Sequence, residues 1–152
     1  MIQKLTKTFI GRPLLPGNVE DTAEVSHVGF SPSASYVDII FKGSKSGVIK
    51  DHDNKDLYNR DIKGKILCLP QSIGSSAGAC MMMAAAKANA TPKVMLFANH
   101  VDSISACGLI MADNWLGKRI IAVDMLGDEF LETVKTGHKV KVYEDGTVEI
   151  EE

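Results

Sequence analysis

The segment ILCLPQSIGSSAGAC covers residues 66–80. It has the pattern of a short buried strand, a turn of small residues and the start of an apolar helix. The first backbone N–H groups of a helix have no partner within the helix, and the helix dipole adds partial positive charge there. Because small side chains let an anionic group approach these donors, we expect Ser75 and Ser76 to lie where a carboxylate or phosphate can bind.

Serine at this position also has a structural interpretation, since serine is a preferred N-cap whose loss costs a helix about 1 kcal/mol. The two roles are compatible, because one serine can cap the helix while the other presents its hydroxyl to a ligand. The rest of the sequence offers no acid–base pair, metal-ligand cluster or nucleophile triad that would complete a catalytic site. The stretch therefore predicts half of a site.

From residue 64 onward, apolar strands alternate with helices. This alternation predicts βαβ units and a parallel sheet that is covered on at least one face. Asp145-Gly146 stands between two alternating stretches, and this strong hairpin signal places a β-hairpin at the end of the chain. We expect strands at 66–69, 94–98, 120–123, 140–143 and 147–150, and helices at 76–89, 104–112 and 128–136.

The first half of the chain is less regular. A strand is predicted over 2–9, and residues 12–36 read mostly as loop because Gly, Pro and Ser are frequent there. Residues 36–41, YVDIIF, are a further strand candidate. Residues 42–65 are polar and turn-rich, with one short extended piece at 47–49.

The helix that follows the serines reads AGACMMMAAAKANA over residues 77–90 and is apolar on nearly all sides. A helix of this kind is buried on more than one side. It can be a core helix of a well-covered domain, or part of it can face a second subunit, for which adjacent methionines provide an adaptable surface.

The composition limits the possible function classes. A net charge of −2 argues against binding nucleic acid or an anionic membrane surface. No apolar run approaches the length of a membrane span, and the first residues lack the apolar core of a signal peptide. Three cysteines without metal spacing suit a reducing cytoplasm. The sequence therefore predicts a cytoplasmic protein, with residues 1–152 forming one domain.

With the turn placed, the chain resembles the small subunit, or swivelling domain, of the aconitase X family of hydro-lyases. The resemblance covers residues 10–125. The Gly-Ser signature at 74–78 stands in order and spacing with the other matching segments, which makes the match specific. These segments are Gly11 with Pro16-Gly17, the stretches 46–51, 61–70 and 91–94, and Gly108 with Ala112.

The resemblance implies a swivelling α/β domain with three layers, β/β/α, in which a parallel central sheet lies beside an outer antiparallel sheet. It also implies a large catalytic subunit that carries iron or an iron–sulfur cluster, so that this chain itself binds no metal. By analogy with aconitases, Ser75 acts as the base, and we expect Gly74 and Ser76 to contact a small carboxylate substrate. Without the large subunit, the chain should be inactive.

Family members dehydrate cis-3-hydroxy-L-proline or mevalonate 5-phosphate. We favour cis-3-hydroxy-L-proline, because the basic residues lie mostly away from the Gly-Ser-Ser turn in the sequence and a phosphorylated substrate would need them. A mevalonate 5-phosphate dehydratase small subunit is the alternative substrate assignment. A non-catalytic anion-binding module is the alternative from a different class. None of the four histidines lies in a turn of the kind that carries a phosphoryl group in swivelling phosphotransfer domains.

Overall fold

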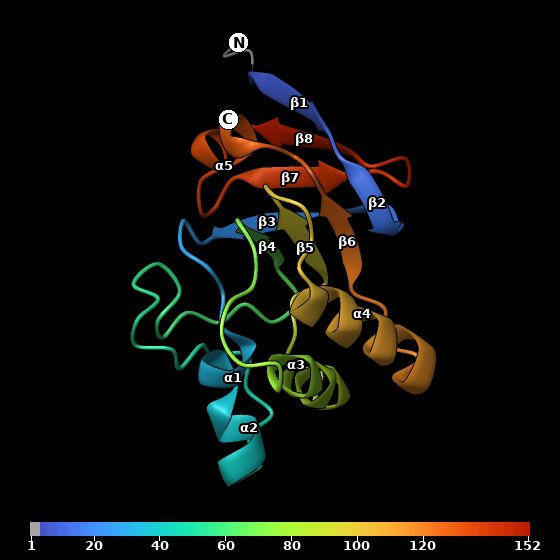
Figure 1. The fold of residues 1–152 in the computed structure, drawn as a ribbon. Coiled ribbons are helices and arrows are strands. Elements are labelled where there is room, and N and C mark those ends of the chain that lie inside the picture. The colour runs from blue at the N-terminus through green and yellow to red at the C-terminus, as the bar shows by residue number, and fades with distance from the viewer. Residues whose placement is uncertain (1–3) are drawn as a thin grey trace.

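The computed structural model describes residues 4–152. At the centre lie three parallel strands, β4, β5 and β6, formed by the apolar stretches of the second half of the chain. Helices α3 and α4 connect these strands and lie together against one face of the sheet (Figure 1). The bounds are Ile66–Leu69 for β4, Gly78–Lys87 for α3, Val94–Phe97 for β5, Ser103–Leu116 for α4 and Ile121–Asp124 for β6.

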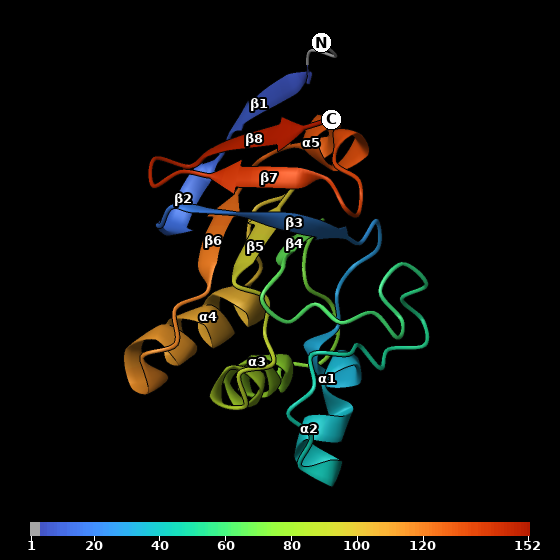
Figure 2. The same cartoon turned by 180° about the vertical axis from the view of Figure 1, so that it is seen from behind.

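An antiparallel group of strands covers the other face of the parallel strands (Figure 2). It consists of β1, β8, β7 and β3, which pair in that order. Strand β3 belongs to both groups, since residues 19–22 pair antiparallel with β7 and residues 23–25 pair parallel with β4. The bounds are Thr6–Ile10 for β1, Val19–Val25 for β3, Lys139–Val142 for β7 and Thr147–Glu151 for β8.

The full strand order is β1-β8-β7-β3-β4-β5-β6-β2. Its two end strands are consecutive in the chain, because only Gly11 separates β1 from β2 (Arg12–Leu15). Strand β2 pairs antiparallel with β6. The chain thus passes from the outer antiparallel group to the edge of the parallel group within one residue.

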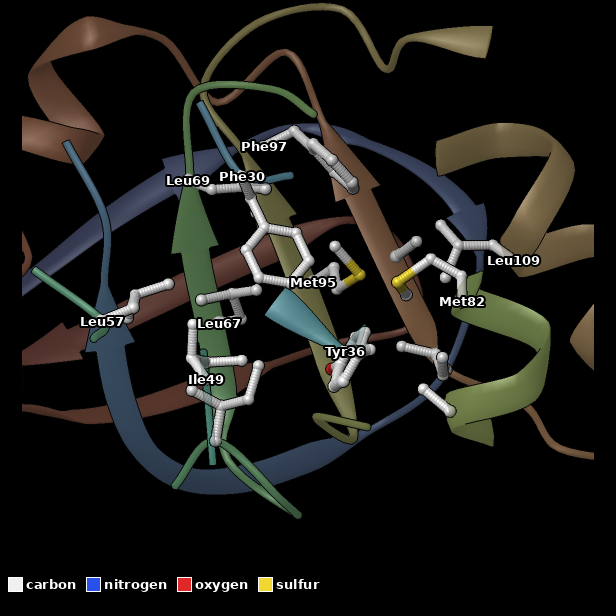
Figure 3. Close-up of a cluster of buried hydrophobic side chains, with 14 of the residues drawn as sticks. Phe30, Tyr36, Ile49, Leu57, Leu67, Leu69, Met82, Met95, Phe97 and Leu109 are labelled. Atoms are coloured by element: carbon white, nitrogen blue, oxygen red, sulfur yellow. The ribbon is translucent and has the colours of Figure 1, made fainter. Parts of the chain in front are cut away.

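Two hydrophobic clusters fill the spaces on either side of the parallel strands. Along β4, Ile66 and Cys68 belong to the cluster against the antiparallel strands, while Leu67 and Leu69 belong to the cluster under the helices. Figure 3 shows the helix-side cluster, in which Leu67 and Leu69 lie with Met82 of α3. Because both faces of a central strand are buried, the strand has no polar positions. The three-layer β/β/α arrangement predicted from the sequence is confirmed.

Helix α3 is covered on several sides, which explains its apolar composition. Besides the sheet it contacts α4, and α1 (Pro32–Ser35) and α2 (Val37–Lys42) also lie against it. An added Cβ at Gly108 of α4 would lie 2.8 Å from the Cβ of Met82, so the two helices approach closely at that point. These contacts support the core-helix interpretation of the methionine-rich segment.

The strand predicted at 36–41 is wrong, because this segment is helical. Tyr36 is buried, with its ring edge-on to that of Phe30 at a centroid distance of 6.0 Å. Ile40 and Phe41 are exposed instead of buried within a sheet. Gly43, in the left-handed conformation at φ +62°, ends α2. The apolar run therefore anchors a short helix at its start rather than filling a strand.

The loop predicted over 12–36 is also wrong for its first half, which contains β2 and most of β3. Strand β2 contains Pro13, which is tolerated because β2 lies at an edge. Strand β3 carries Glu20 and Asp21 in its antiparallel half, where one face is open to water. Tertiary pairing thus stabilises strands whose own sequences signal turns.

The remaining elements lie close to the predicted positions. The expected strand at 2–9 is β1, with residues 2 and 3 outside the described part of the chain. Val48 and Asp61 form an isolated bridge within the expected extended piece at 47–49. Helix α5 (Asp128–Thr133) is shorter than predicted and α4 is longer, whereas β7 and β8 form the predicted hairpin. None of the helices within residues 4–152 has the length and apolarity to cross a bilayer.

Candidate functional site at the carboxyl edge of the parallel strands

The Gly-Ser-Ser turn lies between β4 and α3, where the chain leaves the carboxyl edge of the parallel strands. Ser75 Oγ accepts a hydrogen bond from the backbone N–H of Ala77 at 3.1 Å, and the Ser75 carbonyl accepts one from Gly78 at 2.8 Å. Gly74, Ser75 and Ser76 are all exposed. The predicted residues therefore lie together on an open turn at the amino end of a ten-residue helix.

The capping interpretation is correct in part. The N-cap position of α3 is Ala77, whose side chain makes no capping bond, so neither serine is the N-cap residue itself. Ser75 nevertheless bonds one N–H at the helix start through its side chain. Its hydroxyl is thus held beside the positively polarised helix end and remains accessible from solvent.

A buried polar network fixes the base of this turn to the next loop. Asp102, the N-cap of α4, accepts from the backbone N–H of Ser105 at 2.8 Å and from that of Ser72, also at 2.8 Å. The hydroxyls of Ser72 and Ser105 are hydrogen-bonded to each other, and both residues are buried. These hydrogen bonds therefore fix the position of the turn relative to the start of α4.

A third segment closes against the turn from the other side. The backbone N–H of Ile73 donates to Phe30 at 2.9 Å, and Phe30 donates to Gln71 at 3.0 Å. Gly74 has φ +96°, and an added Cβ there would lie 3.0 Å from Ser31 Oγ. The glycine is required both for this backbone conformation and for the close approach of Ser31.

Two strands further along the same edge, Arg12 and Asp124 form an ion pair. Arg12 donates to the Asp124 carboxylate from Nε at 2.9 Å and from Nη2 at 2.7 Å. The side chain of Asp124 is fully buried, whereas that of Arg12 is 53% exposed. The backbone N–H of Val101 donates to the same carboxylate at 2.7 Å. Hydrogen bonding to Asp124 raises the pKa of Arg12 above its ordinary value.

His100, in the loop after β5, completes this cluster. Its Nδ1 lies 2.8 Å from the Val101 carbonyl, and its Nε2 lies 3.1 Å from Arg12 Nη2. Because a carbonyl can only accept, Nδ1 carries the proton and Nε2 accepts from Arg12. The Arg12 guanidinium is thus hydrogen-bonded both to a neutral imidazole and to a buried carboxylate.

Backbone hydrogen bonds join the three loops that carry these residues. Asn99 donates to Pro70 at 3.2 Å, and Met125 donates to Asn99 at 3.1 Å. The loops after β4, β5 and β6 are therefore adjacent. In open sheets with parallel strands, this edge is where ligands bind.

The opposite edge of the parallel strands carries a shallow hollow of about 370 Å³. Its basic lining side chains are Lys63, Lys93, Lys118 and Arg119. Three of them already have partners: Lys93 binds Asp21, Lys118 binds Asn89 and Arg119 binds Asp113. This hollow contains none of the residues that the sequence indicated as functional.

The described part of the chain has no metal-ligand cluster, and one of its three cysteines is buried. Residues 4–152 contain no group of three or more His, Cys, Asp or Glu side chains arranged to hold a metal ion. Cys68 is buried, and burial raises the pKa of its thiol, which suits a core side chain and not a nucleophile. Residues 4–152 therefore offer no ligand set for the iron, which the resemblance assigns to the large subunit.

Sequence reasoning pointed to Ser75, Ser76 and Gly74 as site residues, which stays a prediction, and did not point to Arg12, His100 and Asp124, which lie at the same edge of the sheet. Arg12 lies 63 positions before Ser75 and reaches the same edge only because β2 pairs with β6. One signal was available in the sequence, since Asp124 directly follows the apolar run 120–123 and a carboxylate that ends a buried strand needs a partner.

The fold and the serine turn define a swivelling-type β/β/α domain, with the turn at the carboxyl ends of its parallel strands. A family model described as the aconitase X swivel domain matches residues 8–150, and the chain belongs to this family. A crystal structure of Thermococcus kodakaraensis aconitase X in its holo-form superposes with a TM-score of 0.79 at 30% identity, covering 96% of this chain and 99% of that one.

Curated relatives are described as phosphomevalonate dehydratase small subunits. The relative from Pyrococcus furiosus is 33% identical over 106 residues, which cover 69% of this chain and 71% of the relative. The relative from Archaeoglobus fulgidus is 29% identical over 107 residues, which cover 70% of this chain and 74% of the relative. These comparisons confirm the resemblance stated from the sequence.

Proposed function

We propose that this chain is the small subunit of an aconitase X-type dehydratase and that it supplies Ser75 to an active site shared with a large subunit. The observation that carries the proposal is the position of Ser75 Oγ, which is exposed and hydrogen-bonded at the start of α3. The family match and the small-subunit relatives support the partnership. The unpaired cysteines suit the cytoplasm, where we place the complex.

In this proposal Ser75 removes the proton from the carbon beside the substrate carboxylate. The C–H bond breaks, its electron pair forms the C=C bond, and the C–O bond to the departing hydroxide breaks. The proton goes to Ser75 Oγ, which must therefore react as an anion. The N–H of Ala77 already points at this oxygen and would stabilise the negative charge, as would the dipole of α3. We assign the iron to the large subunit.

Mevalonate 5-phosphate is the substrate that we place first. The preference for cis-3-hydroxy-L-proline rested on the distance of basic residues from the turn in the sequence, whereas the fold brings Arg12 to the same edge as Ser75. The small-subunit relatives, which are named for phosphomevalonate, favour the same choice. cis-3-Hydroxy-L-proline is the second substrate to test.

The experiment is co-expression with an aconitase X-type large subunit and assay of both substrates. Ser75→Ala should lower kcat by about 1,000-fold or more, because the base is removed, while the complex still assembles on gel filtration. Ser76→Ala, the matched control on the same turn, should lower kcat/KM by no more than about tenfold. Normal turnover by Ser75→Ala would overturn the assignment.

Calorimetry on the isolated chain distinguishes the dehydratase hypothesis from the alternative of a non-catalytic anion-binding module. A module should bind small carboxylates tightly without a partner. The dehydratase proposal expects no tight binding, because the isolated chain holds only one side of the site. Tight binding by the isolated chain, together with no turnover by the complex, would favour the module.

A further inference from the structure

The guanidinium of Arg12 is half-exposed and is held by two neighbouring side chains. Its Nε and Nη2 bind the buried Asp124, and Nη2 also contacts His100. Within residues 4–152, no oxygen or nitrogen accepts from Nη1, although the side chain is 53% exposed. The guanidinium therefore keeps a free donor edge that faces solvent at the carboxyl edge of the sheet.

The spacing between Arg12 and the serine turn is set by the strands. The turn follows β4, while Arg12 lies on β2, with β5 and β6 in between. Neighbouring strands lie about 4.8 Å apart, so β4 and β2 are separated by roughly 14 Å across the sheet. A ligand that reaches both must be an extended molecule with an anionic group remote from its reacting carbon.

We propose that Arg12 binds the phosphate of a phosphorylated hydroxy acid whose carboxylate end reacts at Ser75, with Asp124 and His100 as positioning residues. This inference rests on the proposed function and assigns the phosphate end of its substrate. Arginine binds phosphate through its planar fork of N–H donors. Asp124 fixes the plane of the guanidinium from behind, and His100 prevents it from rotating about the remaining bond.

The chain contains a matched control at the opposite edge. Arg119 binds Asp113 from Nε at 3.0 Å and from Nη2 at 2.8 Å, and its side chain is 47% exposed. The pair thus has nearly the geometry of Arg12 and Asp124. It differs in place, since Arg119 lies just before β6 and Arg12 lies beside the end of β6. It also differs at Nη1, which in Arg119 donates to the Pro16 carbonyl at 3.3 Å.

The test measures kinetics of the complex with the large subunit on mevalonate 5-phosphate. Arg12→Lys and Arg12→Gln should raise KM by about 10- to 100-fold, because a charge-assisted bond to phosphate is weakened or lost, with kcat within about threefold. Both variants should also weaken competitive inhibition by inorganic phosphate. Arg119→Gln should change neither value by more than about twofold. His100→Ala should raise KM by about three- to tenfold while leaving the ion pair in place, which keeps the test valid if Arg12→Gln misfolds.

The possible outcomes separate this inference from the proposed function. A rise in KM for the Arg12 variants alone, with Ser75→Ala inactive, supports both. Equal effects at Arg12 and Arg119, or none at either, overturn the role of Arg12 while Ser75→Ala still tests the base. Turnover of cis-3-hydroxy-L-proline without turnover of mevalonate 5-phosphate overturns the phosphate assignment and leaves the dehydratase class intact. Lack of turnover of either substrate overturns both.

Discussion

At the carboxyl edge of the parallel strands, Arg12 binds Asp124 through Nε and Nη2, and at the amino edge Arg119 binds Asp113 through the same two nitrogens. The two edges nevertheless present opposite helix ends. Helices α3 and α4 begin at the carboxyl edge and end near the amino edge, at Lys87 and Leu116. A basic side chain at the amino edge therefore complements the negative helix ends, while one at the carboxyl edge lies beside positive ends and adds to them.

This difference shows why positive charge alone does not mark the ligand site. The hollow at the amino edge collects Lys63, Lys93, Lys118 and Arg119, yet three of these have protein partners and the adjoining helix ends expose carbonyl oxygens. The carboxyl edge has fewer cations but combines the amino ends of α3 and α4, the serine hydroxyl and an oriented guanidinium. An anionic ligand is favoured where these donors point outward together.

The largest loss of folding stability should come from substitution of Gly11, because this glycine allows β2 to lie against the end of β6. An added Cβ would lie 2.6 Å from the Asp124 carbonyl oxygen and 2.6 Å from Val123 Cγ1. Gly11→Val should therefore cost about 3 kcal/mol of unfolding free energy, more than 100-fold in the folding equilibrium. Gly117→Ala at the amino edge, where the space is open but φ is +62°, should cost only about 1 kcal/mol. Urea denaturation measures both, and equal losses would contradict the tight packing at Gly11.

The next largest loss of stability should distinguish Asp124 from Asp113, the carboxylates that bind the two arginines. Asp124 is fully buried and accepts from Arg12 and from the Val101 N–H, whereas Asp113 is 18% exposed and accepts from Arg119 alone. Asp124→Asn should cost about 2 kcal/mol because buried charge-assisted bonds are lost, and Asp113→Asn less than about 1 kcal/mol. Thermal unfolding of both variants checks the order, and the reverse order would show that burial does not decide the strength of these pairs.

A smaller effect concerns docking of the large subunit. If it closes over the carboxyl edge, the amides of residues 71–78 and 99–101 should exchange with solvent about tenfold more slowly in the complex. The amides of residues 63–65 and 117–119 at the amino edge should exchange at unchanged rates. Hydrogen–deuterium exchange of the free chain and the complex measures this contrast. Protection at the amino edge alone would place the partner on the wrong side for Ser75.

The smallest effect is a pH dependence at the amino edge. Lys93, and next the Thr22 N–H, hold the pKa of Asp21 below its ordinary value of 3.8. A depressed carboxyl pKa contributes stability that is complete above the unfolded value, about pH 4, and is lost as pH falls through the folded value. Asp21→Asn should therefore lower stability at pH 7 by less than about 1 kcal/mol and flatten its decline below pH 4. An unchanged acid limb in the variant would contradict the role of this pair.

Most of the second half of the fold could be predicted from the sequence, and the first half only in part. Strands such as Ile66–Leu69 and Val94–Phe97 are apolar at every position because both faces are buried, so their signal is local. Arg12–Leu15 and Val19–Val25 carry proline and acidic residues, and their strand structure depends on β6, β7 and β4. Segment 36–41 was wrongly predicted as a strand, because its apolar residues are not buried together. Tyr36 is buried, whereas the end of the helix that follows it is exposed.

The serine turn could be predicted from local sequence, because the strand, the small residues and the helix start are adjacent in the chain and act through backbone groups. The parallel order of strands and helices could be predicted too, since hydrophobic periodicity is a local property. Only the tertiary structure brought Arg12, His100 and Asp124 together at the same edge. Their contact depends on the pairing of β2 with β6 across more than one hundred residues, and no local pattern encodes a pairing over that distance.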